Sequence, residues 1–258
     1  SRMDWVVAWA TTAVCGDAAA LERLNQWLAD WANRNPPYKG PNWKCGQEAS
    51  IRVMHLVVAA WILGQDRSPE AGVVDLLRVH LQRIAPTISF LAGRDPRADV
   101  WAHKGRRWLE ERAKTLIEAD GSFSQHSVTY HRVMLDTYSL AEAWRGQRGL
   151  PAFSARLKAR LAAATDWLWT MTDTETGDVP NIGANDGARL LQLTGTDYRD
   201  FRPSVQLAAA LFRGANAFGP GPWTTPLDLL GVAHGKPSAA PASQSFDQGG
   251  YHVLRNAT

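Results

Sequence analysis

The sequence predicts a mostly helical protein built from antiparallel helix pairs. Apolar residues recur at helical spacing through the first two thirds of the chain, and short turns separate the segments. The chain also holds 12 tryptophans, whose large area suits the core between helices as well as platforms for sugar rings. These observations fit a bundle, a solenoid or a toroid.

Four helical segments are predicted before residue 122. Residues 45–64 are apolar on several sides, as in an inner helix, while Pro86 is expected to kink or stop the segment 71–91. Residues 101–121 close at the turn signal Asp120-Gly121. The first segment, 17–35, carries an apolar stripe of Leu21, Leu24, Leu28 and Trp31.

The next helix is expected to start with Ser124 as its N-cap, and another covers residues 153–173. Residues 181–195 read as a loop, and Pro203 opens a helix over 203–212.

Near residue 233 the composition changes. Residues 233–245 form a linker rich in Ala, Ser and Pro, and residues 246–256 follow with strand-like residues around a Gly-Gly turn. A lone strand is unstable, and the sequence shows no partner for it. We therefore predict a helical domain over 1–232, and a linker with the start of a β-rich domain over 233–258.

Composition excludes few functions. No apolar run is long enough to cross a bilayer, and the start of the chain lacks a cleavable signal pattern. Cys15 and Cys45 match no metal motif and are expected to be buried thiols. A net charge of +3 favours anionic partners only weakly, and the basic run 103–107 reads as a solvated helix face more readily than as a nucleic-acid site.

The stretch "DGSFSQHSVTYHRVMLD", residues 120–136, concentrates groups that can hold or move a proton. With Ser124 as N-cap, His126 and Tyr130 are four residues apart on one helix face, and His131 and Arg132 lie on adjacent faces. Cations and a helix N-terminus lower the pKa of a phenol, which suits Tyr130 to proton transfer. The alternative is a tyrosine bonded to a neighbouring helix, with histidines as polar surface.

This stretch resembles the segment that carries the catalytic tyrosine in the heparinase II/III-like polysaccharide lyases, which commonly read Asp-Gly-Ser, a polar pair, Ser and Tyr-His. Three further stretches resemble the same family in the same order, and together they cover most of residues 35–258. They are "NWKCGQEASIRVMHLVVAAW" (42–61), "NIGANDGARLLQLTGTDYRDFRPSVQLAAALF" (181–212) and "FDQGGYHVLR" (246–255).

The resemblance implies an all-α fold, an incomplete (α/α) toroid of antiparallel helix pairs, followed by a β-sandwich. It also implies cleavage of a uronate-containing polysaccharide, of glycosaminoglycan or alginate type, by β-elimination in a bacterial, periplasmic or secreted protein. Tyr130 matches the family's proton-transferring tyrosine. No metal, cofactor or nucleic-acid partner is expected.

One family element does not appear. An Asn-Asn-His-like run that neutralises the substrate carboxylate is expected just after residues 86–90, but no asparagine occurs between residues 64 and 119. Either a helix is deleted at the Phe90-Leu91 junction, or a segment is absent from this sequence. A true deletion favours a second hypothesis, a carbohydrate-binding toroid without chemistry.

Other candidates keep two interpretations each. Glu48 and Arg52 have the spacing of a structural salt bridge, but lie in a family-like motif. The loop with Asn185 is either a turn or a substrate contact, and Arg199 can clamp a carboxylate or tie a loop down. A glycoside hydrolase, the third hypothesis, needs paired carboxylates, and Glu48, Asp120 and Asp186 are the candidates for them. The predicted catalytic residues are Tyr130, His126 and His131, and the predicted substrate-binding residues are Arg132, Asn42, Gln47, Glu48, Arg52, Asn185, Asp186, Arg189 and Arg202.

Overall fold

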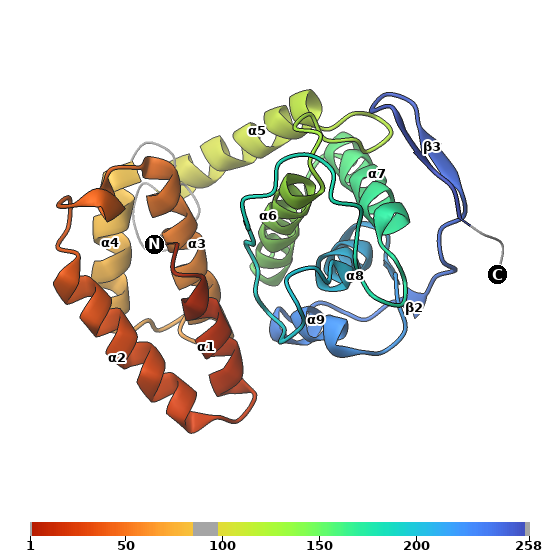
Figure 1. The fold of residues 1–258 in the computed structure, drawn as a ribbon. Helices are drawn as coiled ribbons and strands as arrows, with labels where there is room; N and C mark the ends of the chain where they lie inside the picture. The colour runs from red at the N-terminus through yellow and green to blue at the C-terminus, as the bar shows by residue number, and fades with distance from the viewer. Residues whose placement is uncertain (1, 85–97, 256–258) are drawn as a thin grey trace. The chain divides into compact units, whose positions relative to one another are not determined.

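The computed structural model describes residues 2–84 and 98–255 (Figure 1). Over these residues the predicted helical class is confirmed, because the chain forms nine α-helices and only short strands. The chain divides into two compact units, Ser1–Gly105 with Leu190–Leu193, and Arg106–Arg189 with Thr194–Thr258. The predicted division at residues 232 and 233 stays a prediction. No helix among the described residues combines the length and apolarity that a membrane crossing requires.

The first unit consists of helices that pack on their neighbours in the chain. Helix α1 packs against α2 and α3, and α3 packs against α4. The Asp17 side chain accepts the Ala20 N–H at 3.2 Å and so caps the start of α2. The elements are α1 (Asp4–Val14), α2 (Ala18–Arg34), the 3₁₀ turn η1 (Pro41–Trp43), α3 (Gly46–Ile62) and α4 (Ala71–Ile84). The predicted continuation of α4 through Pro86, and the Phe90-Leu91 junction, lie outside the described residues.

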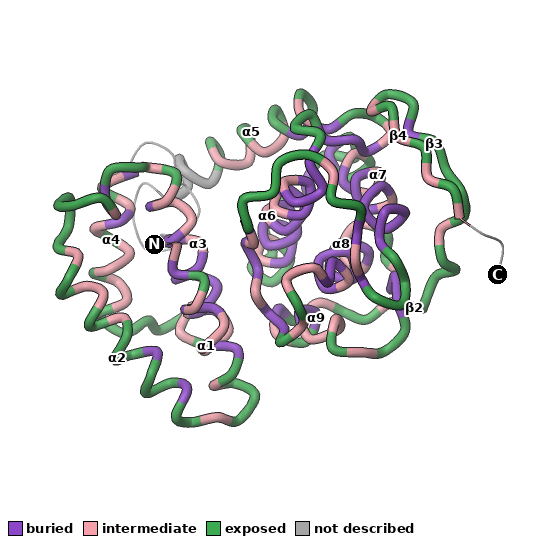
Figure 2. The backbone as a smooth tube through the Cα atoms, viewed as in Figure 1, coloured by how far each residue is buried: buried purple, intermediate pink, exposed green. Residues whose placement is uncertain are grey.

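The second unit holds the larger core, which α6, α7 and α8 share (Figure 2). Leu135, Leu168 and Val205, one from each helix, are fully buried in it. Helix α7 packs against α6 and α8. The helices are α6 (Val128–Gln147), α7 (Ala155–Met171), α8 (Arg202–Phe212) and α9 (Thr225–Leu229), with a 3₁₀ turn η2 (Pro222–Thr224). Helix α5 (Ala98–Leu116) begins in the first unit and belongs to the second from Arg106 on.

The C-terminal residues form two small sheets. Strand β1 (Ala215–Asn216) pairs in parallel with β2 (Lys236–Pro237), and β3 (Gln244–Phe246) pairs antiparallel with β4 (Tyr251–Val253). The strand-like residues predicted after 246 therefore do have a partner. It is the end of the predicted linker, whose Ser and Gln residues hide a strand from a composition argument.

Two sequence expectations about local structure are wrong. Helix α6 begins at Val128 with Ser127 as its N-cap, three residues after the predicted cap at Ser124. Residues 124 and 125 instead form a turn, and His126 adopts a left-handed backbone conformation with φ of 49°. Cys15 and Cys45 are exposed, because they stand at helix ends, as the C-cap of α1 and the N-cap of α3.

Candidate functional site

The start of α6 lies under the loop of residues 181–188. The Ser127 hydroxyl donates to the carbonyl of Ala184 at 2.6 Å and also accepts the Tyr130 N–H that the helix leaves without a partner. The Val128 N–H donates to the carbonyl of Ile182 at 3.2 Å. The loop and the first turn of α6 thus form one bonded structure.

Tyr130 connects this turn to the loop through its side chain. Its hydroxyl donates to Oδ2 of Asp186 at 2.9 Å, while its half-buried ring packs on the core of the second unit. Asp186 is exposed, so this end of the phenol lies at the surface. A phenol and a carboxylate at this distance can exchange a proton.

His126 precedes the N-cap and is not on the helix face of Tyr130. Its ring is exposed, and its Nδ1 lies 3.1 Å from the hydroxyl of Tyr251, which belongs to β4. The predicted i, i+4 pairing of His126 and Tyr130 therefore does not form. Both residues lie in the five-residue stretch 126–130, which bonds to the loop 181–188 through Ser127 and Val128.

His131 and Arg132 point into the core. His131 is buried, hydrogen-bonds the carbonyl of Ala164 through Nε2 at 2.9 Å, and stacks on Trp167 at 4.4 Å. Burial lowers the pKa of His131 to about 4, so the ring is neutral near pH 7. The expected flanking of the Tyr130 hydroxyl by cations is accordingly not what the structure shows.

Arg132 holds the polypeptide that follows the loop. Its guanidinium donates to the carbonyl of Tyr198 at 2.6 Å and to that of Ala188 at 3.2 Å, and it lies over the rings of Tyr198 and Phe201. The side chain is buried, which lowers its pKa. It therefore ties Ala188, Tyr198 and Phe201 to α6.

The other candidate polar side chains of this region bond to other residues of the protein. Asn185 accepts the Tyr198 hydroxyl at 2.8 Å, and Arg189 donates to the carbonyl of Thr196 at 3.4 Å. Arg202 pairs with Asp200 at 2.9 Å and lies over Trp223. Arg199 in turn bonds Asp178.

The remaining candidates lie in the first unit. Arg52 is buried and donates to Nε2 of His80 at 3.0 Å and to the carbonyl of Asn42 at 2.6 Å. Glu48 forms a 3.1 Å salt bridge with Arg2, and its charge also acts on Arg52, where it raises the pKa against the larger lowering by burial. Gln47 is exposed. Arg52 thus supports the fold of this unit from inside.

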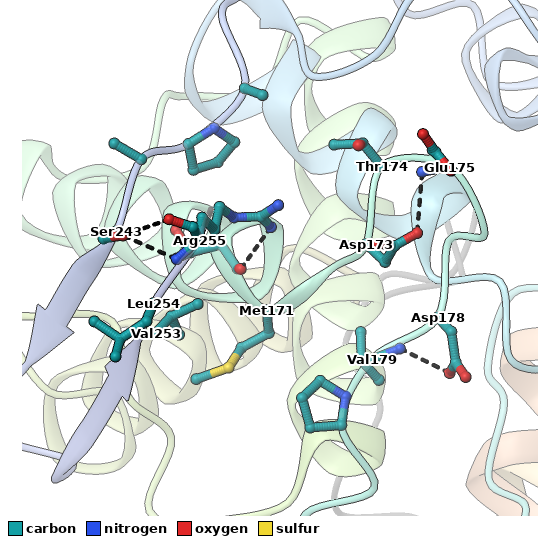
Figure 3. A pocket seen from close by; sticks show the side chains of 15 residues that line it. Met171, Asp173, Thr174, Glu175, Asp178, Val179, Ser243, Val253, Leu254 and Arg255 are labelled. Atoms are coloured by element: carbon teal, nitrogen blue, oxygen red, sulfur yellow. Dashed lines mark hydrogen bonds between the residues drawn. The ribbon is translucent and has the colours of Figure 1, made fainter. Parts of the chain in front are cut away.

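An open pocket of about 1150 Å³ lies elsewhere in the second unit, between the loop after α7 and the C-terminal strands (Figure 3). Carboxylates of Asp173, Glu175 and Asp178 line it, with Arg255 among the residues of the strand side. No predicted site residue lines it. Three carboxylates make it a poor place for an acidic polymer. Its lining is Thr170, Met171, Asp173, Thr174, Glu175, Asp178, Val179, Pro180, Ala240, Pro241, Ala242, Ser243, Val253, Leu254 and Arg255.

Among the described residues, no three His, Cys, Asp or Glu side chains are grouped so that they could hold a metal ion. Comparisons of the chain with family models, with curated proteins and with solved structures find no match.

Two contributors to the site were missed in the sequence. Tyr251 reaches His126 across 125 residues, and Tyr198 reaches Asn185 and Arg132. Tyr251 could have been noticed in the sequence, because it lies in the family-like stretch 246–255. No local pattern predicts the role of Tyr198, because its partners Asn185 and Arg132 are distant in the sequence.

Proposed function

We propose that the protein is a polysaccharide lyase of the heparinase II/III-like type, which cleaves a uronate-containing polysaccharide by β-elimination. The observation that carries the proposal is the Tyr130 hydroxyl, 2.9 Å from the Asp186 carboxylate at the exposed edge of the α6 N-terminus. It adds to the sequence resemblance a proton acceptor for the phenol.

The proposed reaction needs one proton to move twice. A base removes the proton on C5 of the uronate, the electron pair forms the C4–C5 double bond, and the bond from C4 to the glycosidic oxygen breaks. An acid then protonates the leaving oxygen. Tyr130 performs both transfers when elimination is syn, and Asp186 accepts the phenolic proton that must leave before Tyr130 acts as base.

The proposed architecture is an incomplete (α/α) toroid. Its support is that successive helices pack on each other within each unit, as α1 does on α2, α3 on α4, and α7 on α8. Helix pairs of this kind are the repeating element of helical toroids and solenoids.

The second candidate function is carbohydrate binding without chemistry. It is favoured by the commitment of three predicted substrate cations to the protein's own contacts. Arg52 and Arg132 are buried, and Arg202 pairs with Asp200. A uronate carboxylate that is not neutralised keeps its C5 proton hardly acidic.

The experiment uses the full chain with a panel of uronate polysaccharides, including alginate and glycosaminoglycans. Ultraviolet absorbance of the unsaturated product follows elimination, and a reducing-end assay runs in parallel. We expect an absorbance increase that Tyr130→Phe abolishes. Tyr138→Phe is the matched control, because it removes a hydroxyl bonded to a backbone carbonyl in the interior of the same unit.

The outcomes separate the hypotheses. New reducing ends without unsaturated product indicate a hydrolase. Binding to a polysaccharide column without either product indicates the binding module. An absorbance increase that Tyr130→Phe leaves intact overturns the role of Tyr130.

A further inference from the structure

The backbone at His126 is held in a conformation that few residues with a side chain adopt. Its φ of 49° lies in the left-handed region, where a side chain costs about 1–2 kcal/mol. Gly183 packs against the His126 carbonyl so closely that a Cβ there would stand 2.1 Å from the oxygen. Strain that the surroundings enforce is typical of functional positions.

Tyr251 determines which nitrogen of His126 is engaged. Its hydroxyl lies 3.1 Å from Nδ1, and the two rings tilt toward each other at 6.1 Å between centroids. The Tyr251 ring also meets Trp167 edge-on at 5.1 Å. Nε2 of His126 makes no hydrogen bond within the described part of the chain.

The tautomer of His126 sets the direction of this hydrogen bond, because a tyrosine hydroxyl can both donate and accept. Burial raises the pKa of Tyr251, so its hydroxyl keeps its proton and can donate it to Nδ1. A neutral imidazole that accepts at Nδ1 carries its own proton on Nε2.

Asp120 fixes the hairpin that delivers Tyr251. Its Oδ2 accepts the backbone N–H groups of Gln248 and Gly249 at 2.8 and 3.2 Å, and its Oδ1 accepts the Ser122 N–H. In return, the Gln248 side-chain oxygen accepts hydrogen bonds from the backbone N–H groups of Ala119 and Asp120. Four of these hydrogen bonds tie the β3–β4 turn to the Asp-Gly-Ser turn that begins the site.

We propose that Tyr251 is a positioning residue of the Tyr130 site, which holds Nδ1 of His126 so that the Nε2–H is presented to the sugar. The proposal rests on the proposed lyase function for its kinetic part, but not for its structural part. The hairpin β3–β4 then belongs to the active site and is more than a neighbouring element.

The test is Tyr251→Phe, which removes the hydroxyl and keeps the ring that contacts His126 and Trp167. Nitrogen NMR of the imidazole reports protonation and hydrogen bonding at Nδ1 and Nε2 without any substrate. We expect the wild type to show a protonated Nε2 and a hydrogen-bonded Nδ1, and the variant to lose the shift at Nδ1. We expect kcat to fall about tenfold with little change in KM, the size of one lost hydrogen bond.

Tyr138→Phe is again the control, since it loses a buried hydroxyl bond to Leu109 but should leave both His126 nitrogens and kcat unchanged. A wild-type His126 protonated at Nδ1 overturns the proposal, even if the Tyr251→Phe variant fails to fold. So does an unchanged Nδ1 signal in the variant. Absence of unsaturated product from the wild type rejects the lyase function instead, and the NMR result stands apart from it.

Discussion

The hydroxyl of Tyr130 donates to the carboxylate of Asp186 across 56 residues of sequence, at 2.9 Å. The loop that supplies Asp186 is hydrogen-bonded to the α6 N-terminus through Ser127 and Val128. These bonds fix the position of Asp186 relative to Tyr130. The Tyr130 hydroxyl therefore has a proton acceptor in the protein itself, the Asp186 carboxylate. The proposed chemistry therefore depends on Asp186 as much as on Tyr130.

Asp186→Asn should lower kcat by about 10²- to 10⁴-fold, the range for loss of a general acid or base. The amide can still accept the hydrogen bond but cannot take the proton. The measurement is the initial rate of unsaturated-product formation, with Glu118→Gln as the control, because Glu118 is an exposed carboxylate of the same unit. Equal rates for the two variants would show that Asp186 only orients the ring.

Much of the helical fold could be predicted from the sequence, because helical periodicity is a local signal. Helices α2, α3, α7 and α8 lie within two residues of their predicted ranges, whereas α5 ends at Leu116 and not at the predicted turn of Asp120 and Gly121. The cap of α6 was missed because Ser124 and Ser127 are equally good N-cap residues. What decides between them is tertiary: the Ser124 N–H bonds the Leu116 carbonyl, and the Ser127 hydroxyl bonds Ala184.

The burial of His131 and Arg132 was available in the sequence. Both stand on the stripe of Val128 and Leu135, at the i, i+3, i+4 and i+7 positions of one face. The chemistry of the two side chains suggested a site more strongly than the stripe suggested a core. By contrast, the contacts of Tyr130 with Asp186 and of His126 with Tyr251 join distant segments, and no local pattern contains them.

The buried His131 should make the fold sensitive to acid. Its pKa in the folded state is about 4, below the ordinary 6.5, because burial disfavours the charged ring. The unfolded chain binds more protons below pH 6.5, so stability should fall as the pH drops from about 6.5 to 4, by about 3 kcal/mol in all. Urea unfolding at a series of pH values measures this loss.

His131→Phe should remove that contribution while it keeps a ring stacked on Trp167. The variant should be less stable than the wild type at pH 7.5, since the Ala164 carbonyl loses its partner, and less dependent on pH below 6.5. His103→Phe, at an exposed position of α5, serves for comparison. An unchanged pH dependence in the His131 variant would mean that His131 binds a proton as readily in the folded protein as in the unfolded chain.

Arg132 should stabilise the fold through its hydrogen bonds and ring contacts, and not through its charge alone. Arg132→Lys keeps the charge but cannot span both the Tyr198 and Ala188 carbonyls or stack between the two rings. We expect a loss of about 3 kcal/mol in urea unfolding. Hydrogen exchange should accelerate at residues 188–201. Arg156→Lys, an exposed change of the same kind, should have no effect. A stable variant with a protected loop would contradict this role.

Two glycines of the loop 181–188 offer a matched test of its contact with α6. Gly183 and Gly187 have nearly the same left-handed φ, 74° and 75°, so an alanine at either position should cost about 1–2 kcal/mol of backbone strain. Only at Gly183 would the added Cβ also meet a neighbour, 2.1 Å from the His126 carbonyl oxygen, whereas Gly187 faces open space. Gly183→Ala should therefore push the loop off α6, separate Asp186 from Tyr130, and reduce kcat far more than Gly187→Ala does. Initial rates and urea unfolding of the two variants, measured side by side, check this. Equal losses would contradict the proposal that the contact of Gly183 with His126 keeps Asp186 beside Tyr130.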